Sequence, residues 1–119
     1  MGITNVTLKV INLKDESRFV EESFLVDSGA SLSVLPPKIT RKVGIKPTGE
    51  KRQFSLADGT IVERGIGEAI FEFQGKRAPS LVVIGQKGDS PILGALTLEA
   101  MGLVLDPFKR QLFEAKLFL

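Results

Sequence analysis

The chain contains neither cysteine nor histidine among its 119 residues. Without cysteine it can form no disulfide, so a reducing compartment suits it. The two absences together exclude Ser-His-Asp and Cys-His catalysis, zinc sites built on imidazole or thiolate, and the usual proton shuttle at neutral pH. If the protein is an enzyme, carboxylates must therefore carry the acid–base chemistry, and we expect neither a metal ion nor another cofactor.

Tryptophan and tyrosine are also absent, so aromatic platforms for single-stranded nucleic acid could come only from phenylalanine. The formal net charge of +2 is too small to imply a polyanionic partner. Basic residues do gather in one region, at Lys38, Arg41, Lys42, Lys46, Lys51 and Arg52. We interpret them as a solvated face and expect no nucleic-acid partner. A small β-barrel that binds nucleic acid through this face is a weaker alternative.

Long hydrophobic runs are missing, and the segment 81–84 is typical of those present. The first residues lack the basic start and apolar stretch of a signal peptide. We therefore expect no membrane partner and a cytoplasmic location. Hydrophobic residues make up 43% of the chain and charged residues 25%, as in ordinary globular proteins. This composition and length predict one folded domain over residues 1–119.

Short apolar segments separated by turn-forming residues predict a compact all-β domain, and a barrel in particular. The predicted strands cover residues 4–12, 18–26, 33–35, 53–56, 60–62, 66–73, 81–84, 103–105 and 111–117. Two short helices are predicted over 37–43 and 94–101, ending at Gly44 and Gly102. Asp58-Gly59 between two strand-forming segments predicts a hairpin.

The segment Asp27-Ser28-Gly29-Ala30 carries the chemistry of the sequence. It follows the apolar run 24–26, so the pattern brings a carboxylate from a buried strand onto a turn of small residues. Burying an ionised group costs on the order of several kcal/mol unless hydrogen bonds or a shared proton relieve it. So costly a placement favours a functional role for the carboxylate. A simple turn is the alternative, because Asp, Ser and Gly all form turns.

Three segments resemble the retropepsin-like aspartic proteases. They are the motif 26–30, the hairpin around Ala57-Asp58-Gly59, and the later segment Ile92-Leu93-Gly94 with the residues that follow it. They occur in the family's order over most of the chain, from about Val6 to Asp106. The resemblance implies a closed β-barrel with one or two short helices and a flap hairpin.

The resemblance also implies a mechanism. In this family two aspartates flank one water and share one proton, because two close carboxylates cannot both ionise. One acts as base toward the water and the other as acid toward the scissile carbonyl. This chain supplies only one Asp-Ser-Gly, since Asp15, Asp58, Asp89 and Asp106 lack the matching glycine. The active site would therefore need a two-fold symmetric homodimer, with a polypeptide as substrate.

By resemblance, the catalytic group comprises Asp27, Ser28 and Gly29. Ser28 would hydrogen-bond across the two-fold axis, and Gly29 would donate its N–H to Asp27. Substrate-binding residues would be Ala30 in the floor of the cleft and Ala57, Asp58 and Gly59 in the flap. Ile92, Leu93 and Gly94 would pack behind the Asp27 loop and support it.

Two functions remain open at this point. The first is a homodimeric aspartic endopeptidase, favoured because Asp27, Ser28 and Gly29 are all present. The second is a protease-like module without turnover that dimerises or binds peptides. For the apolar tail over 108–119 three arrangements are open: a strand in a dimer sheet, pairing within the subunit, or a cover over the cleft.

Overall fold

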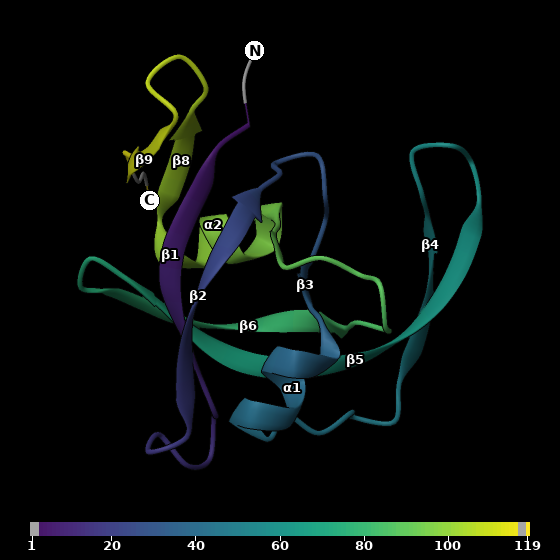
Figure 1. The fold of residues 1–119 in the computed structure, drawn as a ribbon. Helices are drawn as coiled ribbons and strands as arrows, with labels where there is room; N and C mark the ends of the chain where they lie inside the picture. Colours follow the sequence, from purple (N-terminus) through teal and green to yellow (C-terminus); the bar gives the residue numbers. More distant parts are fainter. Residues whose placement is uncertain (1–2, 117–118) are drawn as a thin grey trace.

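A computed structural model describes residues 3–116 and 119, and its described part contains nine strands and two short helices (Figure 1). The strands are β1 (Asn5–Ile11), β2 (Phe19–Val26), β3 (Ser33–Leu35), β4 (Lys51–Ser55), β5 (Ile61–Phe73), β6 (Lys76–Ile84), β7 (Ile92–Leu93), β8 (Leu103–Asp106) and β9 (Gln111–Glu114). The helices are α1 (Pro37–Val43) and α2 (Ala95–Met101). The predicted all-β class is confirmed.

Six of the strands close into a ring. In order around it they are β1, β2, β7, β3, β6 and β5, and β5 pairs back onto β1. The closing pair joins Val10 to Phe71 in an antiparallel register. Closure leaves these strands without a free edge. It also brings the ends of β2, β3 and β7 together, although they lie far apart in the chain.

β4 lies outside the ring and pairs only with β5. The two strands form a long hairpin that projects from the body at the right of Figure 1. Its tip is a tight turn in which the Leu56 N–H bonds to the Thr60 carbonyl at 2.8 Å. The Asp58 side chain accepts the Thr60 N–H at 2.9 Å, as Asx turns do. The hairpin predicted from Asp58-Gly59 is confirmed.

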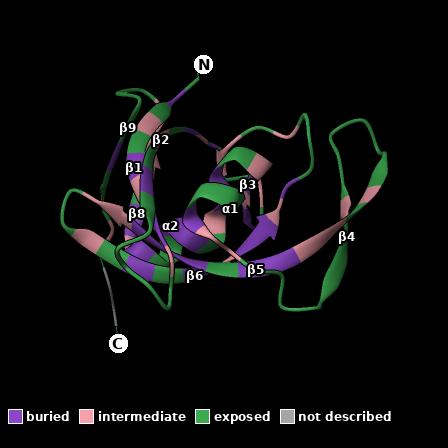
Figure 2. Ribbon diagram, turned by 60° about the horizontal axis from the view of Figure 1, so that its bottom comes forward, coloured by how far each residue is buried: buried purple, intermediate pink, exposed green. Residues whose placement is uncertain are grey.

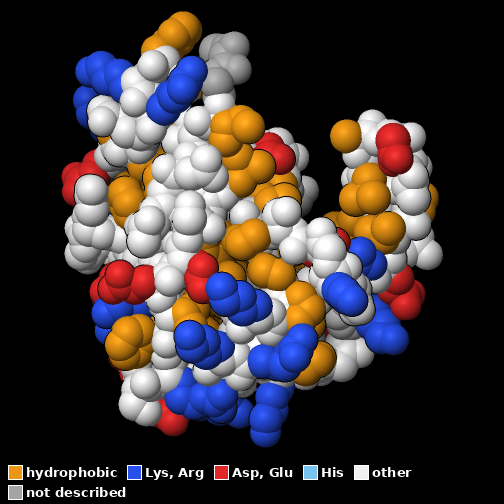
Figure 3. Space-filling view, in the orientation of Figure 1, with side chains coloured by type: hydrophobic (Ala, Val, Ile, Leu, Met, Phe, Trp, Pro, Cys, Tyr) orange, Lys and Arg blue, Asp and Glu red, His pale blue; other side chains and the backbone are white. Residues whose placement is uncertain are grey.

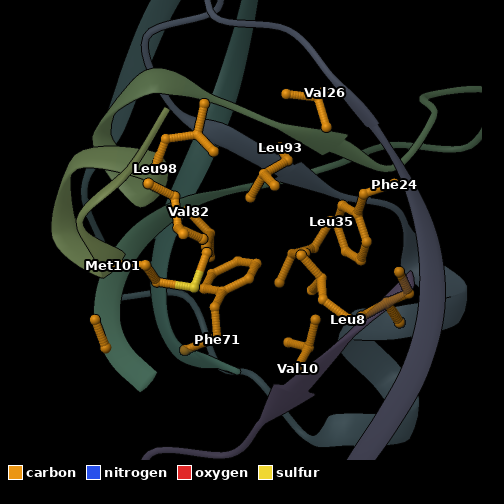
Figure 4. Close-up of a cluster of buried hydrophobic side chains, with 14 of the residues drawn as sticks. Leu8, Val10, Phe24, Val26, Leu35, Phe71, Val82, Leu93, Leu98 and Met101 are labelled. Atoms are coloured by element: carbon orange, nitrogen blue, oxygen red, sulfur yellow. The ribbon is translucent and has the colours of Figure 1, made fainter. Parts of the chain in front are cut away.

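The interior of the ring is filled by apolar side chains that alternate along its strands. Phe24 and Phe71 are fully buried there and meet edge to face, with ring centroids 6.2 Å apart (Figure 4). Leu98 and Met101 of α2 close one side of this cluster. Buried residues accordingly concentrate in the ring, whereas the hairpin carries mostly exposed ones (Figure 2).

Both helices end at the glycines that the sequence predicted as their ends. Gly44 after α1 and Gly102 after α2 have φ values of 78° and 68°. This left-handed conformation is easily adopted only by glycine and closes the last turn of each helix. Among the described residues, no helix is long and apolar enough to cross a membrane.

The predicted strands at 60–62 and 66–73 are one continuous strand, β5. Glycines at 65 and 67 lower the local strand propensity, but pairing to β4 and β6 carries the strand through them. β6 also starts earlier than the predicted 81–84, at Lys76, and includes Pro79. These boundaries were missed because tertiary pairing overrides local preference.

The C-terminal segment pairs within its own subunit. β9 lies antiparallel to β8 in a separate two-stranded sheet, with Phe113 opposite Val104. Of the three arrangements left open for the tail, the structure takes this one for residues 111–114. The predicted strand to 117 ends at Glu114, and residues 117–118 lie outside the described part.

Candidate active site

The loop after β2 carries Asp27 and is held by its own backbone. The Ala30 N–H bonds to the Asp27 carbonyl at 3.1 Å and closes a turn. The Gly29 N–H donates to Oδ1 of Asp27 at 2.9 Å, as the family resemblance implied. A Cβ at position 29 would lie 3.2 Å from the same oxygen, so glycine suits this close approach. The loop therefore fixes the orientation of the carboxylate.

Asp27 is exposed in the single subunit, as are Ser28 and Gly29. The premise that the strand buries this carboxylate was therefore wrong at the level of one chain. β2 alternates between buried and exposed residues and ends at the buried Val26, and the turn then places Asp27 in an exposed position in the lining of the cleft. The apolar run predicted the strand, but it could not show that the residue after the strand would be exposed to solvent.

The segment 92–94 packs directly against this loop. β7 pairs with the end of β2, and the Asp27 N–H bonds to the Leu93 carbonyl at 3.0 Å. From the next residues, the Ala95 N–H reaches the Ala30 carbonyl at 2.8 Å. A Cβ on Gly94 would lie 2.5 Å from the backbone of Leu32, so only glycine fits there. The loop and the segment behind it form one rigid backbone unit.

A buried cluster of three hydroxyl groups contacts the backbone unit formed by the Asp27 loop and the segment 92–94. Thr97 of α2 lies within hydrogen-bonding distance of Ser33 (2.6 Å) and of Ser80 in β6 (3.0 Å). Ser33 in turn accepts the Gly94 N–H at 3.0 Å. Sequence reasoning missed this cluster, because single Ser and Thr residues carry no recognisable spacing.

A cleft of about 790 Å³ lies between the β4–β5 hairpin and the body, and Figure 3 shows the hollow with hydrophobic side chains on both walls. Predicted site residues that line it are Asp27, Gly29, Ala30, Ala57 and Ile92. Ser28, Asp58, Gly59, Leu93 and Gly94 are not in its lining. The structure thus brings the Asp27 loop, the start of the hairpin turn and β7 together around one cleft.

The remaining lining residues were not predicted. Apolar ones are Leu32, Val34, Phe54, Leu56, Val62 and Val83, and polar ones are Ser31, Gln53, Ser55, Arg64, Asp89 and Ser90. Several of the apolar ones belong to a small second core beneath the hairpin, around Leu32, Ile66 and Val83. No sequence pattern distinguishes them from residues of the main core, since both sets are apolar residues in or beside short strands.

The predicted basic face lies around α1 and β4, and Figure 3 shows Lys and Arg side chains gathered near α1. Some of these cations face carboxylates: Lys38 lies 3.7 Å from Glu22 and Arg52 lies 3.2 Å from Glu50. None of the six basic residues lines the cleft. Among the described residues no group of three or more acidic side chains could hold a metal ion.

The family model for aspartyl proteases matches residues 10–98, which include the Asp27 loop, the hairpin and β7. The chain belongs to the retropepsin-like aspartic proteases. Two solved structures share the fold of this aspartic protease family member. They are the EIAV protease complexed with the inhibitor HBY-793, and the retroviral protease-like domain of Ddi1 from Leishmania major.

The TM-score is 0.61 for both structures. The EIAV protease is 21% identical, with 99% of this chain and 94% of that chain covered. The Ddi1 domain is 17% identical, with 98% and 91% covered. No curated protein sequence matches the chain. At these identities the similarity establishes the fold, while the family membership rests on the matched residues.

Proposed function

We propose that this retropepsin-like protein is an aspartic endopeptidase that hydrolyses peptide bonds in extended polypeptides. The observation that supports this proposal is the Asp27 carboxylate, which is held by the Gly29 N–H and lines the cleft between the body and the β4–β5 hairpin. Asp89 also lines the cleft, but both its oxygens accept hydrogen bonds from Arg64. Asp27 is thus the one carboxylate in the cleft lining without a cationic partner among the described contacts.

A single such carboxylate is half of an aspartic dyad. The proposed enzyme is a homodimer in which Asp27 of each subunit approaches the two-fold axis and the pair shares one proton. One carboxylate accepts a proton from a water molecule while the oxygen of that water attacks the peptide carbonyl carbon. The other donates the shared proton to the carbonyl oxygen. Collapse of the tetrahedral intermediate then breaks the C–N bond. The carboxyl that took the proton from water gives it to the leaving amine, and a hydroxyl of the intermediate returns a proton to the other carboxylate, which restores the shared proton.

The surrounding residues have proposed roles in this reaction. Ser28 would hydrogen-bond across the axis beneath the carboxylates, and the N–H of Gly29 holds Asp27 in place. Ala30 leaves room in the floor for an extended chain. Ala57, Asp58 and Gly59 at the hairpin tip would close over the peptide and exclude water. Residues 1–119 would act as one domain in the cytoplasm, without metal ion or cofactor.

The test compares the wild type with Asp27→Asn, which keeps the shape of the side chain and removes the base. We expect the wild type to cut an unfolded polypeptide, detected as fragments by mass spectrometry, and the variant to leave it intact. Glu99→Gln, on the exposed face of α2, is a matched control and should keep activity. Sedimentation should find a dimer for all three proteins.

Two results would overturn the proposal. Cleavage by Asp27→Asn at the wild-type rate would place the chemistry elsewhere. A wild type that dimerises and binds peptides but cuts none would support the protease-like module without turnover.

A further inference from the structure

Besides Asp27, the lining of the cleft contains two charged residues, Arg64 and Asp89, which form an ion pair. Nε of Arg64 lies 2.9 Å from Oδ2 of Asp89, and Nη2 lies 3.3 Å from Oδ1. The side chains are only 20% and 27% exposed. A two-point contact between a guanidinium and a carboxylate has a fixed geometry and is stronger than a typical surface ion pair. The pair therefore makes a rigid joint between the two segments that carry it.

The polar atoms of this joint are directed at protein groups. Asp89 also accepts the Gln86 N–H at 2.7 Å, and its own N–H returns to the Gln86 carbonyl at 3.0 Å. The remaining Nη1 of Arg64 donates to the Glu63 carbonyl at 3.0 Å. With both partners occupied in this way, the pair is suited to holding the cleft in shape and poorly suited to binding a charged substrate group.

Arg64 lies at the root of the hairpin. Pairing between β5 and β6 runs outward only as far as Gly65 opposite Ile84. From Arg64 back to its first residue, Ile61, β5 is paired with β4 alone, so the hairpin leaves the body at Arg64. An interaction at this residue acts at the base of the hairpin, where a small change of angle would displace the tip most.

Asp89 lies in the loop that leads into the floor of the site. Two residues later, the Pro91 carbonyl accepts the Leu25 N–H at 3.1 Å, and β7 follows at once. The carbonyl of Leu93 in β7 accepts the Asp27 N–H. The ion pair consequently connects the root of the hairpin, through one short loop, to the backbone that holds Asp27.

We propose that the Arg64–Asp89 ion pair is a latch that holds the hairpin at the distance from the Asp27 loop at which a polypeptide binds. This inference rests on the proposed function, because it concerns how that site takes up its substrate. Arg64 and Asp89 are positioning residues: they act on peptide binding through the hairpin and leave the bond-breaking step to Asp27.

The experiment is a cycle of Arg64→Gln, Asp89→Asn and the double variant, assayed on one peptide substrate. Each single variant should raise KM about three- to tenfold, the range for losing one well-aligned, half-buried ion pair, with kcat within about twofold of wild type. The double variant should match the singles, because the second change has no partner left to lose. Glu16→Gln is the control, since it breaks the Arg77–Glu16 pair, whose residues do not line the cleft.

Amide hydrogen exchange of the same proteins gives a readout that does not need catalysis. In Asp89→Asn the hairpin amides over 51–61 should exchange faster, while those of the β8–β9 hairpin should be unchanged. If the wild type cuts no peptide, the proposed function fails and the exchange data alone decide the latch. An active Asp89→Asn enzyme with wild-type KM, or hairpin exchange equal to wild type, would overturn the latch.

Discussion

The hydroxyl oxygens of Ser33 and Thr97 lie 2.6 Å apart in a position where both side chains are fully buried. One residue begins β3 directly after the Asp27 loop, and the other lies in the middle of α2. Their contact, extended to Ser80 and to the N–H of Gly94, ties four segments together beneath the candidate active site. Buried hydrogen bonds of this kind are valuable chiefly because an unpaired partner is costly.

Thr97→Val should destabilise the protein by about 1–3 kcal/mol. The substitution keeps the shape of the side chain but leaves the buried hydroxyls of Ser33 and Ser80 short of a partner. Urea denaturation measures the change in the free energy of unfolding. Thr97→Ser keeps the hydroxyl and is the matched control, with a smaller loss from the missing methyl group. Equal losses in both variants would show that packing, and not the hydrogen bonds, matters at this position.

Gly94→Ala should cost about 2 kcal/mol or more in stability. Its Cβ would lie 2.5 Å from the carbonyl carbon and oxygen of Leu32, and backbone cannot move aside as a flexible side chain can. Thermal unfolding at a fixed protein concentration measures the loss. Gly65→Ala is the control, because its nearest atoms lie 3.9 Å from the new Cβ. We expect that variant to unfold at or slightly above the wild-type temperature.

Cleavage per subunit should rise with protein concentration and then reach a plateau. If each active site needs Asp27 from two chains, the active fraction follows the monomer–dimer equilibrium by mass action. Initial rates over a wide dilution series, compared with the dimer fraction from sedimentation, test this. Cleavage per subunit that stays constant well below the dissociation constant of the dimer would mean that one chain suffices.

The Arg64–Asp89 ion pair should persist in mildly acidic solution. We expect the proposed enzyme to work there, because its two Asp27 carboxylates must keep one shared proton. Hydrogen bonds from Arg64 hold the pKa of the Asp89 carboxyl below its ordinary value of 3.8, helped by the Gln86 N–H and by the charge of Arg64. Because the pKa is lower in the folded state, the ionised pair stabilises the fold fully above the ordinary value. That stabilisation is lost as the pH falls through the lowered pKa.

The measurement is the difference in unfolding free energy between wild type and Asp89→Asn as a function of pH. It should be constant from neutral pH down to about the ordinary aspartate range and shrink below it. A difference that already disappears between pH 7 and 5 would mean that another group controls the pair.

The sequence alone determined most elements of the fold, because their patterns are local. Strands such as β3 and helices such as α1 follow from short periodic runs and from the Pro and Gly residues that bound them. The Asp58-Gly59 turn is equally local, and the structure has a hairpin turn where the sequence predicted it. Family membership also follows from residues that can be recognised one segment at a time.

Only the tertiary structure decided which distant groups meet. Arg64 and Asp89 are separated by 25 positions and Ser33 and Thr97 by 64, and neither pair has a period or motif that would link its members. The closure of β1 onto β5 and the exposure of Asp27 directly after the buried Val26 were equally invisible in the sequence. Such contacts depend on the path of the whole ring, because topology, and not local propensity, sets which side chains share a space.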